Sequence, residues 1–233
     1  MRVLAFDATG PVVTVGLAAD GKPIARHDIP AVRSHGSVLE LAIDEVLSHA
    51  GSSRRGVQGL ALVTGPGSLT ATRIGWATAA GWAQAMSIPV TGWPTPVTHH
   101  RYWTELSRAA QPDSRTRTCC LVHYRGDAFY CYEFAREHPP GEPIIVRLGA
   151  WSPSGAPRVR IVGPGAVGRA NRDRWRAALG SDVELADESE CLVGGDVLAV
   201  WGEEALRTEG GISLDRSPLD YGLPPDFRRW NGP

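Results

Sequence analysis

The chain has 233 residues, of which 42% are hydrophobic and 21% charged, and its formal net charge at pH 7 is −1. These values are ordinary for a globular protein, and without any basic run the chain alone is a poor candidate for tight RNA binding. No apolar run is long enough to span a membrane and no charged-then-apolar leader opens the sequence, so we expect a cytoplasmic protein without a membrane partner. The four cysteines lack CxxC spacing, which favours small buried residues over a zinc or redox site.

The first thirty residues predict an antiparallel start to a sheet. Short apolar runs at residues 3–6, 12–18 and 24–29 are typical of strands, and Asp20-Gly21 is a strong hairpin signal. The first run ends in residues 7–11, a turn rich in hydroxyl, carboxylate and glycine. Residues 34–50 then predict a helix that ends at Gly51. Its apolar positions are Val38, Leu39, Leu41, Ala42, Ile43, Val46 and Leu47.

The next stretch, residues 60–86, is the most distinctive part of the chain. It predicts a buried strand, a glycine-rich turn and a helix whose first amides are capped by the hydroxyls of Ser68 and Thr70. A row of small residues runs along this helix, with Trp82 beside it: Ala71, Gly75, Ala79 and Ala83. A helix this apolar must be covered on most sides, by its own sheet and by either another helix of this chain or a partner.

A glycine-rich turn between a strand and a helix also has the general shape of an anion site. We therefore interpret six residues as a phosphate-loop-like nucleotide cleft: Asp7, Thr9, Gly65, Pro66, Gly67 and Ser68. The alternative is a tight connection that binds nothing. Ser68 is not in a Gly-x-Ser-x-Gly elbow, and the adjacent His99 and His100 lack a convincing ligand spacing, so the sequence predicts neither a catalytic residue nor a metal site.

The pattern of the second half repeats the plan of the first. After a strand near residues 88–92 and a helix over 95–106, strands are expected at 118–123, 128–134, 144–148 and 158–162. A helix over 166–179, a strand at 183–185, a helix over 196–207 and an extended tail complete the chain. The fold class is therefore α/β, with two lobes of mixed sheets flanked by helices. We place an N-terminal lobe at 1–105, a C-terminal lobe at 106–190, and a final helix and tail at 191–233.

Several of these stretches together resemble one family. Residues 3–9 resemble the opening strand and turn of the ASKHA superfamily, which includes actin, sugar kinases and Hsp70. Residues 65–75 are similar to the Gly-Pro-Gly-Ser-(Phe/Tyr)-Thr-Gly-x-Arg-Ile-Gly hallmark of the TsaB family, proteins of tRNA threonylcarbamoyladenosine biosynthesis. The resemblance is strong over about the first 95 residues and departs from the family at Gly36, Ser37, Leu69 and Ala71.

The resemblance implies a non-catalytic subunit that pairs with a catalytic paralogue, TsaD. It implies a TsaE-like ATPase on that pair, a homodimer in isolation, and contact with tRNA only through the complex. ATP and metal are expected on the partner subunits and no cofactor on this chain, because Thr95 and His99 stand where TsaD has a His-x-x-x-His metal pair. The implied partner interface is the helix pair, at His35, Leu39, Ile43, Ala71, Gly75, Ala79, Trp82 and Ala83.

Two alternatives stay open at this point. One is an independent ASKHA-fold enzyme, for example a nucleotide-dependent kinase or carbamoyltransferase. The other is a free-standing homodimer that has lost its partner surface.

Overall fold

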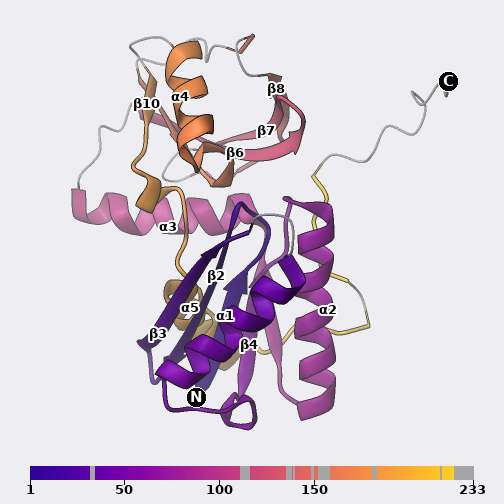
Figure 1. Ribbon diagram of the computed structural model, residues 1–233. Coiled ribbons are helices and arrows are strands. Elements are labelled where there is room, and N and C mark those ends of the chain that lie inside the picture. The colour runs from indigo at the N-terminus through magenta and orange to yellow at the C-terminus, as the bar shows by residue number, and fades with distance from the viewer. Residues whose placement is uncertain are drawn as a thin grey trace, which may run out of the picture.

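The computed structural model has two five-stranded sheets stacked one above the other, with helix α3 (Thr95–Ala110) between them (Figure 1). It describes residues 1–31, 35–110, 116–134, 138, 140–147, 150–151, 158–179, 183–215 and 217–222. We call the sheet of the N-terminal half, with the helices on its faces, the first lobe. The other sheet and its helix form the second lobe.

The first sheet has the strand order β3-β2-β1-β4-β5. β1, β2 and β3 pair antiparallel, with the Asp20-Gly21 turn between β2 and β3, whereas β1, β4 and β5 pair parallel. The strands are β1 (Arg2–Asp7), β2 (Val12–Ala19), β3 (Lys22–Pro30), β4 (Gly59–Val63) and β5 (Val90–Trp93). The predicted elements of this half are confirmed, with the last strand starting two residues later than expected.

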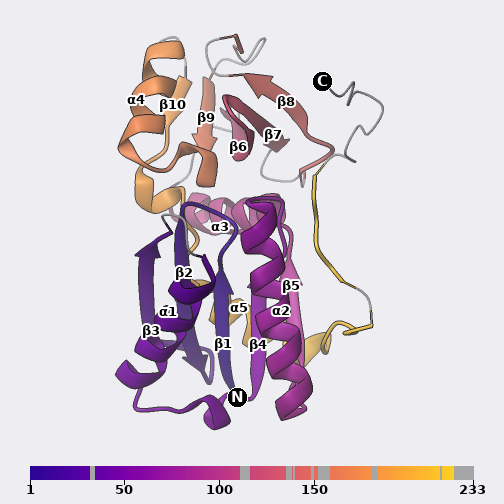
Figure 2. The same cartoon turned by 45° about the vertical axis from the view of Figure 1, so that its right-hand side comes forward.

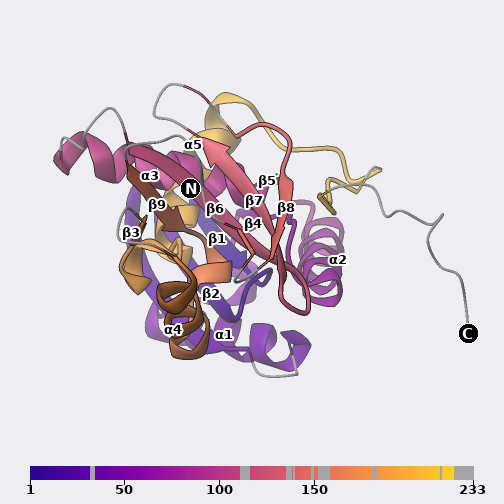
Figure 3. The same ribbon diagram turned by 90° about the horizontal axis from the view of Figure 1, so that it is seen from above.

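Helices cover both faces of the first sheet. Alternate residues of β1 point to opposite faces: Leu4 and Phe6 pack with α1 (His35–His49) and α2 (Leu69–Met86). Val3 and Ala5 pack with α5 (Gly195–Thr208). Seen from above, α1 and α5 lie on opposite sides of the strands (Figure 3). The final helix of the chain thus returns to the first lobe.

The second sheet repeats the topology of the first. Its order is β10-β9-β6-β7-β8, in which β6, β7 and β8 pair antiparallel and β6, β9 and β10 pair parallel. The strands are β6 (Thr116–Arg125), β7 (Ala128–Phe134), β8 (Ile144–Arg147), β9 (Arg158–Val162) and β10 (Val183–Leu185). The duplicated plan inferred from the pattern is confirmed, and with it the two-lobed α/β class.

One predicted helix is shorter than expected. The run at 166–179 divides into a 3-10 turn at Pro164–Ala166 and the helix α4 (Arg169–Ala178). The backbone at Gly168 has φ of +88°, which is outside helical geometry and separates the two pieces. Two further 3-10 turns lie at Arg54–Gly56 and Glu188–Glu190.

Within the described residues no helix combines the length and apolar character needed to cross a membrane. All four cysteines are free and buried, as their spacing indicated. The domain limits at 105 and 190 stay a prediction.

Candidate functional site

A cleft of about 330 Å³ lies where the two lobes meet. The first lobe lines it with the turn after β1 and the turn before α2, and the second lobe with the β6–β7 hairpin, Pro164 and Asn171. Of the described residues in this lining, His123 is the one ionisable side chain. A polyphosphate would find few cationic partners here, because Lys and Arg side chains are what normally neutralise phosphate charge.

Asp7 lies behind this cleft rather than in its lining. The side chain is buried, and Oδ1 accepts hydrogen bonds of 2.7 Å from both the backbone amide and the hydroxyl of Thr9. Burial raises the pKa of the Asp7 carboxyl, although the two hydrogen bonds from Thr9 act in the opposite direction. This carboxylate therefore shapes the turn after β1.

The glycine-rich turn is tied closely to the turn after β1. The amide of Ser68 donates to the carbonyl of Thr9 over 2.9 Å, and a Cβ on Gly67 would lie 2.4 Å from that same oxygen. Gly67 must therefore be glycine for the two turns to meet. Ser68 makes no side-chain capping bond, contrary to our expectation; its carbonyl instead accepts a hydrogen bond from the hydroxyl of Thr72.

The six residues predicted as a nucleotide cleft therefore divide into two groups. Thr9, Gly67 and Ser68 line the cleft between the lobes. Asp7, Gly65 and Pro66 lie outside the lining, and Gly65 is joined to Pro66 by a cis peptide bond. Nucleotide binding in this cleft stays a prediction.

The positions that the resemblance relates to a metal pair do not form one. Thr95 is fully buried and its hydroxyl donates to the carbonyl of Pro66 over 2.8 Å. His99 is 4% exposed, its Nδ1 has no hydrogen-bond partner among the described residues, and burial lowers its pKa to about 4. The described part of the chain contains no group of three or more His, Cys, Asp or Glu side chains that could hold a metal ion. The donor set around His99 thus does not fit a transition metal.

The predicted partner interface needs a correction. Leu39, Ile43, Ala71 and Ala79 are fully buried, Ala83 is 2% exposed, and all of them lie in the core of the first lobe together with Gly75. The row of small residues on α2 faces its own sheet: a Cβ on Gly75 would lie 3.6 Å from the ring of Phe6. These side chains are covered by this chain and are closed to a partner.

Two of the predicted interface residues are not among these core residues. Trp82 is half-buried at the edge of the helix pair, where the guanidinium of Arg54 lies 5.5 Å from its ring centroid. Arg54 also forms ion pairs with Glu40 and Asp44 of α1. His35 is the first residue of α1, and its side chain lies outside the described part of the chain.

The outer surface of α1 and α2 carries apolar residues that the sequence pattern did not assign to an interface. Leu41 is 53% exposed and Leu69 is 52% exposed. Along α2, Ala77, Gly81 and Ala85 are also exposed and follow one another at intervals of four residues. We call Ala77, Gly81 and Ala85 the outer face of α2.

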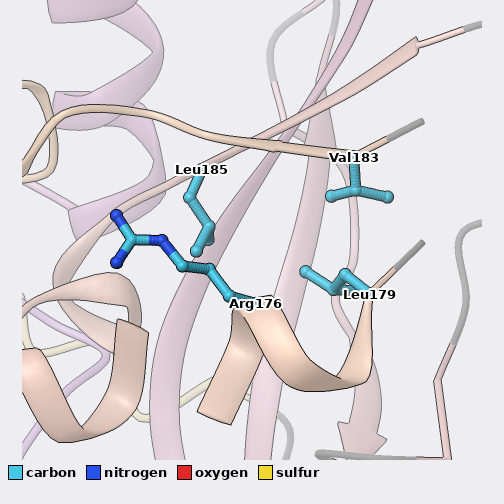
Figure 4. A pocket seen from close by; sticks show the side chains of 4 residues that line it. All are labelled: Arg176, Leu179, Val183 and Leu185. Atoms are coloured by element: carbon cyan, nitrogen blue, oxygen red, sulfur yellow. The ribbon is translucent and has the colours of Figure 1, made fainter. Parts of the chain in front are cut away.

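A second pocket, of about 210 Å³, lies in the second lobe between α4 and β10 (Figure 4). The side chains of Leu179, Val183 and Leu185 line it together with Arg176, whose guanidinium points away from Leu179 and Val183. It shares no lining residue with the cleft between the lobes.

The two duplicated sheets with a cleft between them define the structural class of this protein. YeaZ from Pseudomonas aeruginosa has a similar structure, with a TM-score of 0.67 and 19% identity over 94% of this chain and 99% of that one. The activator of 2-hydroxyisocaproyl-CoA dehydratase from Clostridium difficile, with bound ADPNP, reaches a TM-score of 0.54 at 10% identity over 91% of this chain and 100% of that one. The chain is a two-lobed protein of the ASKHA fold.

Sequence comparison narrows the class. Residues 29–132 match the model of the family TsaD, tRNA N6-adenosine threonylcarbamoyltransferase. The tRNA threonylcarbamoyladenosine biosynthesis protein TsaB of Escherichia coli K12 is 28% identical over 137 residues, which are 59% of this chain and 56% of that protein. The alignment therefore spans little more than half of that relative. The chain is thus similar to TsaB of Escherichia coli in sequence and to YeaZ in fold.

Proposed function

We propose that this chain takes part in the synthesis of threonylcarbamoyladenosine in tRNA, as a non-catalytic subunit that pairs with a TsaD-like paralogue. The paralogue would transfer the threonylcarbamoyl group to the adenosine, with a TsaE-like ATPase and ATP acting on the pair. The similarity to TsaB and to the TsaD family model supports the pathway.

The main support for a non-catalytic role is the hydrogen bond that the hydroxyl of Thr95 makes. The hydroxyl of Thr95 is used in a structural hydrogen bond to Pro66, at the position that the resemblance relates to a metal ligand of TsaD. His99 has no second imidazole or carboxylate in a metal-binding group with it, among the residues described. A chain that matches a transferase family but lacks its donor set is suited to support a catalytic relative.

The outer face of α2 is the surface that we propose for docking. Ala77, Gly81 and Ala85 are exposed, and their small size lets another helix approach closely. A helix pair of the paralogue would complete a four-helix arrangement. In the absence of the paralogue a second copy of this chain would use the same surface.

The proposal is tested by mixing the purified chain with the TsaD-like paralogue of the same organism and measuring molar mass by light scattering after gel filtration. We expect a one-to-one complex. The substitution Ala77→Arg should abolish the complex, because it places a long charged side chain on the close-packed line of the outer face.

The matched control is Ala177→Arg, which places the same charge at an exposed alanine of α4 in the second lobe. It should leave association unchanged. Equal association by the wild-type chain and by Ala77→Arg would exclude the outer face as the docking surface. Failure of the wild-type chain to associate at all would overturn the proposed partnership.

A further inference from the structure

Residues 217–222 follow the final helix and run from the first lobe to the second. Figure 2 shows this segment on the side of α2 and β8, whereas the chain enters α5 on the other side of the molecule. Upstream of it, the amide of Ile212 donates to the carbonyl of Val90 over 2.7 Å, which fixes the start of the return path beside β5. We call residues 217–222 the strap.

The strap is held by the first lobe at the end of β4. The amide of Asp220 donates to the carbonyl of Thr64 over 2.9 Å. A Cβ on Gly65 would lie 2.3 Å from the carbonyl oxygen of Asp220, so the path of the strap requires glycine there. The guanidinium of Arg73 on α2 lies 5.8 Å from the centroid of the Tyr221 ring, within the range of a cation–π contact.

The strap is held by the second lobe at Tyr130. The hydroxyl of Tyr130 donates to the carbonyl of Tyr221 over 3.4 Å, and Tyr130 is only 5% exposed. Gly222 has φ of +74°, and a Cβ there would lie 2.7 Å from Cζ of Tyr130. The amide of Gly222 donates to Oδ1 of Asp220 over 2.8 Å, which closes the turn that presents it to the ring.

Two of the residues that contact the strap lie within two positions in the sequence of residues that line the cleft. Gly65 is two residues before Gly67 and Tyr130 directly follows Phe129, and both Gly67 and Phe129 line the cleft. We propose that the strap ties the two lobes together and sets the width of the cleft between them. Releasing it lets the lobes separate about the connections on the opposite side.

The test is a distance measurement across the cleft in the full chain. Nitroxide labels are attached to Gln84→Cys on α2 and Ala177→Cys on α4, both exposed helical positions, and the labelled chain is diluted with excess unlabelled chain. Pulsed electron paramagnetic resonance should give a narrow distance distribution in the parent. In Gly222→Ala it should broaden and shift to longer distances, because the new methyl group collides with Tyr130.

Gly210→Ala is the matched control, since Gly210 also has a positive φ, +81°, but its Cβ would have open space around it. It should keep the narrow distribution. The double variant Tyr130→Phe with Tyr221→Ala should broaden the distribution as well, and it does so without strain at a glycine. An unchanged narrow distribution in both Gly222→Ala and the double variant, or equal broadening in Gly210→Ala, would overturn the proposal.

Discussion

The hydroxyl of Thr95 donates a hydrogen bond of 2.8 Å to the carbonyl of Pro66. The contact joins the start of α3 to the glycine-rich turn, and the amide of Thr95 reinforces it by donating to the carbonyl of Gly65. The side chain of Thr95 thus stabilises the turn between β4 and α2.

Thr95→Val should lower the free energy of unfolding by about 1–3 kcal/mol, because it leaves the buried carbonyl of Pro66 without its donor. Urea denaturation followed by circular dichroism measures the change. Thr104→Val is the control, since the hydroxyl of Thr104 donates to a carbonyl within its own helix, and it should cost less. Equal losses in the two variants would contradict a special role for the Thr95 contact.

The burial of His99 predicts a pH dependence of stability. Its pKa in the folded chain is about 4, below the ordinary value of 6.5, so the unfolded chain binds the additional proton between these values. The contribution of the neutral His99 to the free energy of unfolding is fully present above pH 6.5. It is lost as the pH falls toward 4, by about 3 kcal/mol in total. Thermal unfolding across this range should show the loss in the parent and a flatter profile in His99→Gln. A parent profile no steeper than that of His99→Gln would count against the buried neutral imidazole.

Gly75 lies on the buried side of α2, whereas Ala77 lies on its outer face. Gly75→Glu should destabilise the chain by about 3 kcal/mol or more, because it buries a charge against Phe6 and Ala8. Ala77→Glu should change stability by less than about 0.5 kcal/mol. The free energies of unfolding of the two variants measure this, and comparable values would refute the assignment of the two sides.

Gly67→Ala should lower the free energy of unfolding by about 1–3 kcal/mol, since the new Cβ would displace the carbonyl of Thr9 from the glycine-rich turn. Gly81→Ala provides the comparison at an exposed position of α2, where nothing lies within 4 Å, and should raise stability by about 0.5–1 kcal/mol. The two midpoints of denaturation should therefore move in opposite directions. A shift of both in the same direction would contradict the close approach of the two turns.

The elements and the duplicated topology could be predicted because strand runs, the Asp-Gly turn and helical spacing are local signals. The sides of α2 could not be assigned this way, since a row of small residues suits a sheet as well as a partner. Only the packing of Gly75 against Phe6 decides between them. Leu41 shows the same limit: it fits the apolar spacing of its helix, yet it is 53% exposed.

The strap could not be predicted from local patterns for a different reason. Tyr221 and Tyr130 are far apart in the sequence, and nothing in the tail specifies that the two meet. Gly65 and Gly222 are required where the strap makes its contacts, because a side chain at either position would collide with the residue opposite. Glycine is, however, equally common in turns where the chain contacts nothing else.

The proposed supporting role predicts that this chain is needed for the threonylcarbamoyladenosine modification of tRNA in the cell. The threonylcarbamoyladenosine content of total tRNA is measured by mass spectrometry of nucleoside digests, in cells depleted of this chain. We expect depletion to remove the modification, the wild-type chain and Ala177→Arg to restore it, and Ala77→Arg to leave it absent. A threonylcarbamoyladenosine content unaffected by depletion would refute the supporting role.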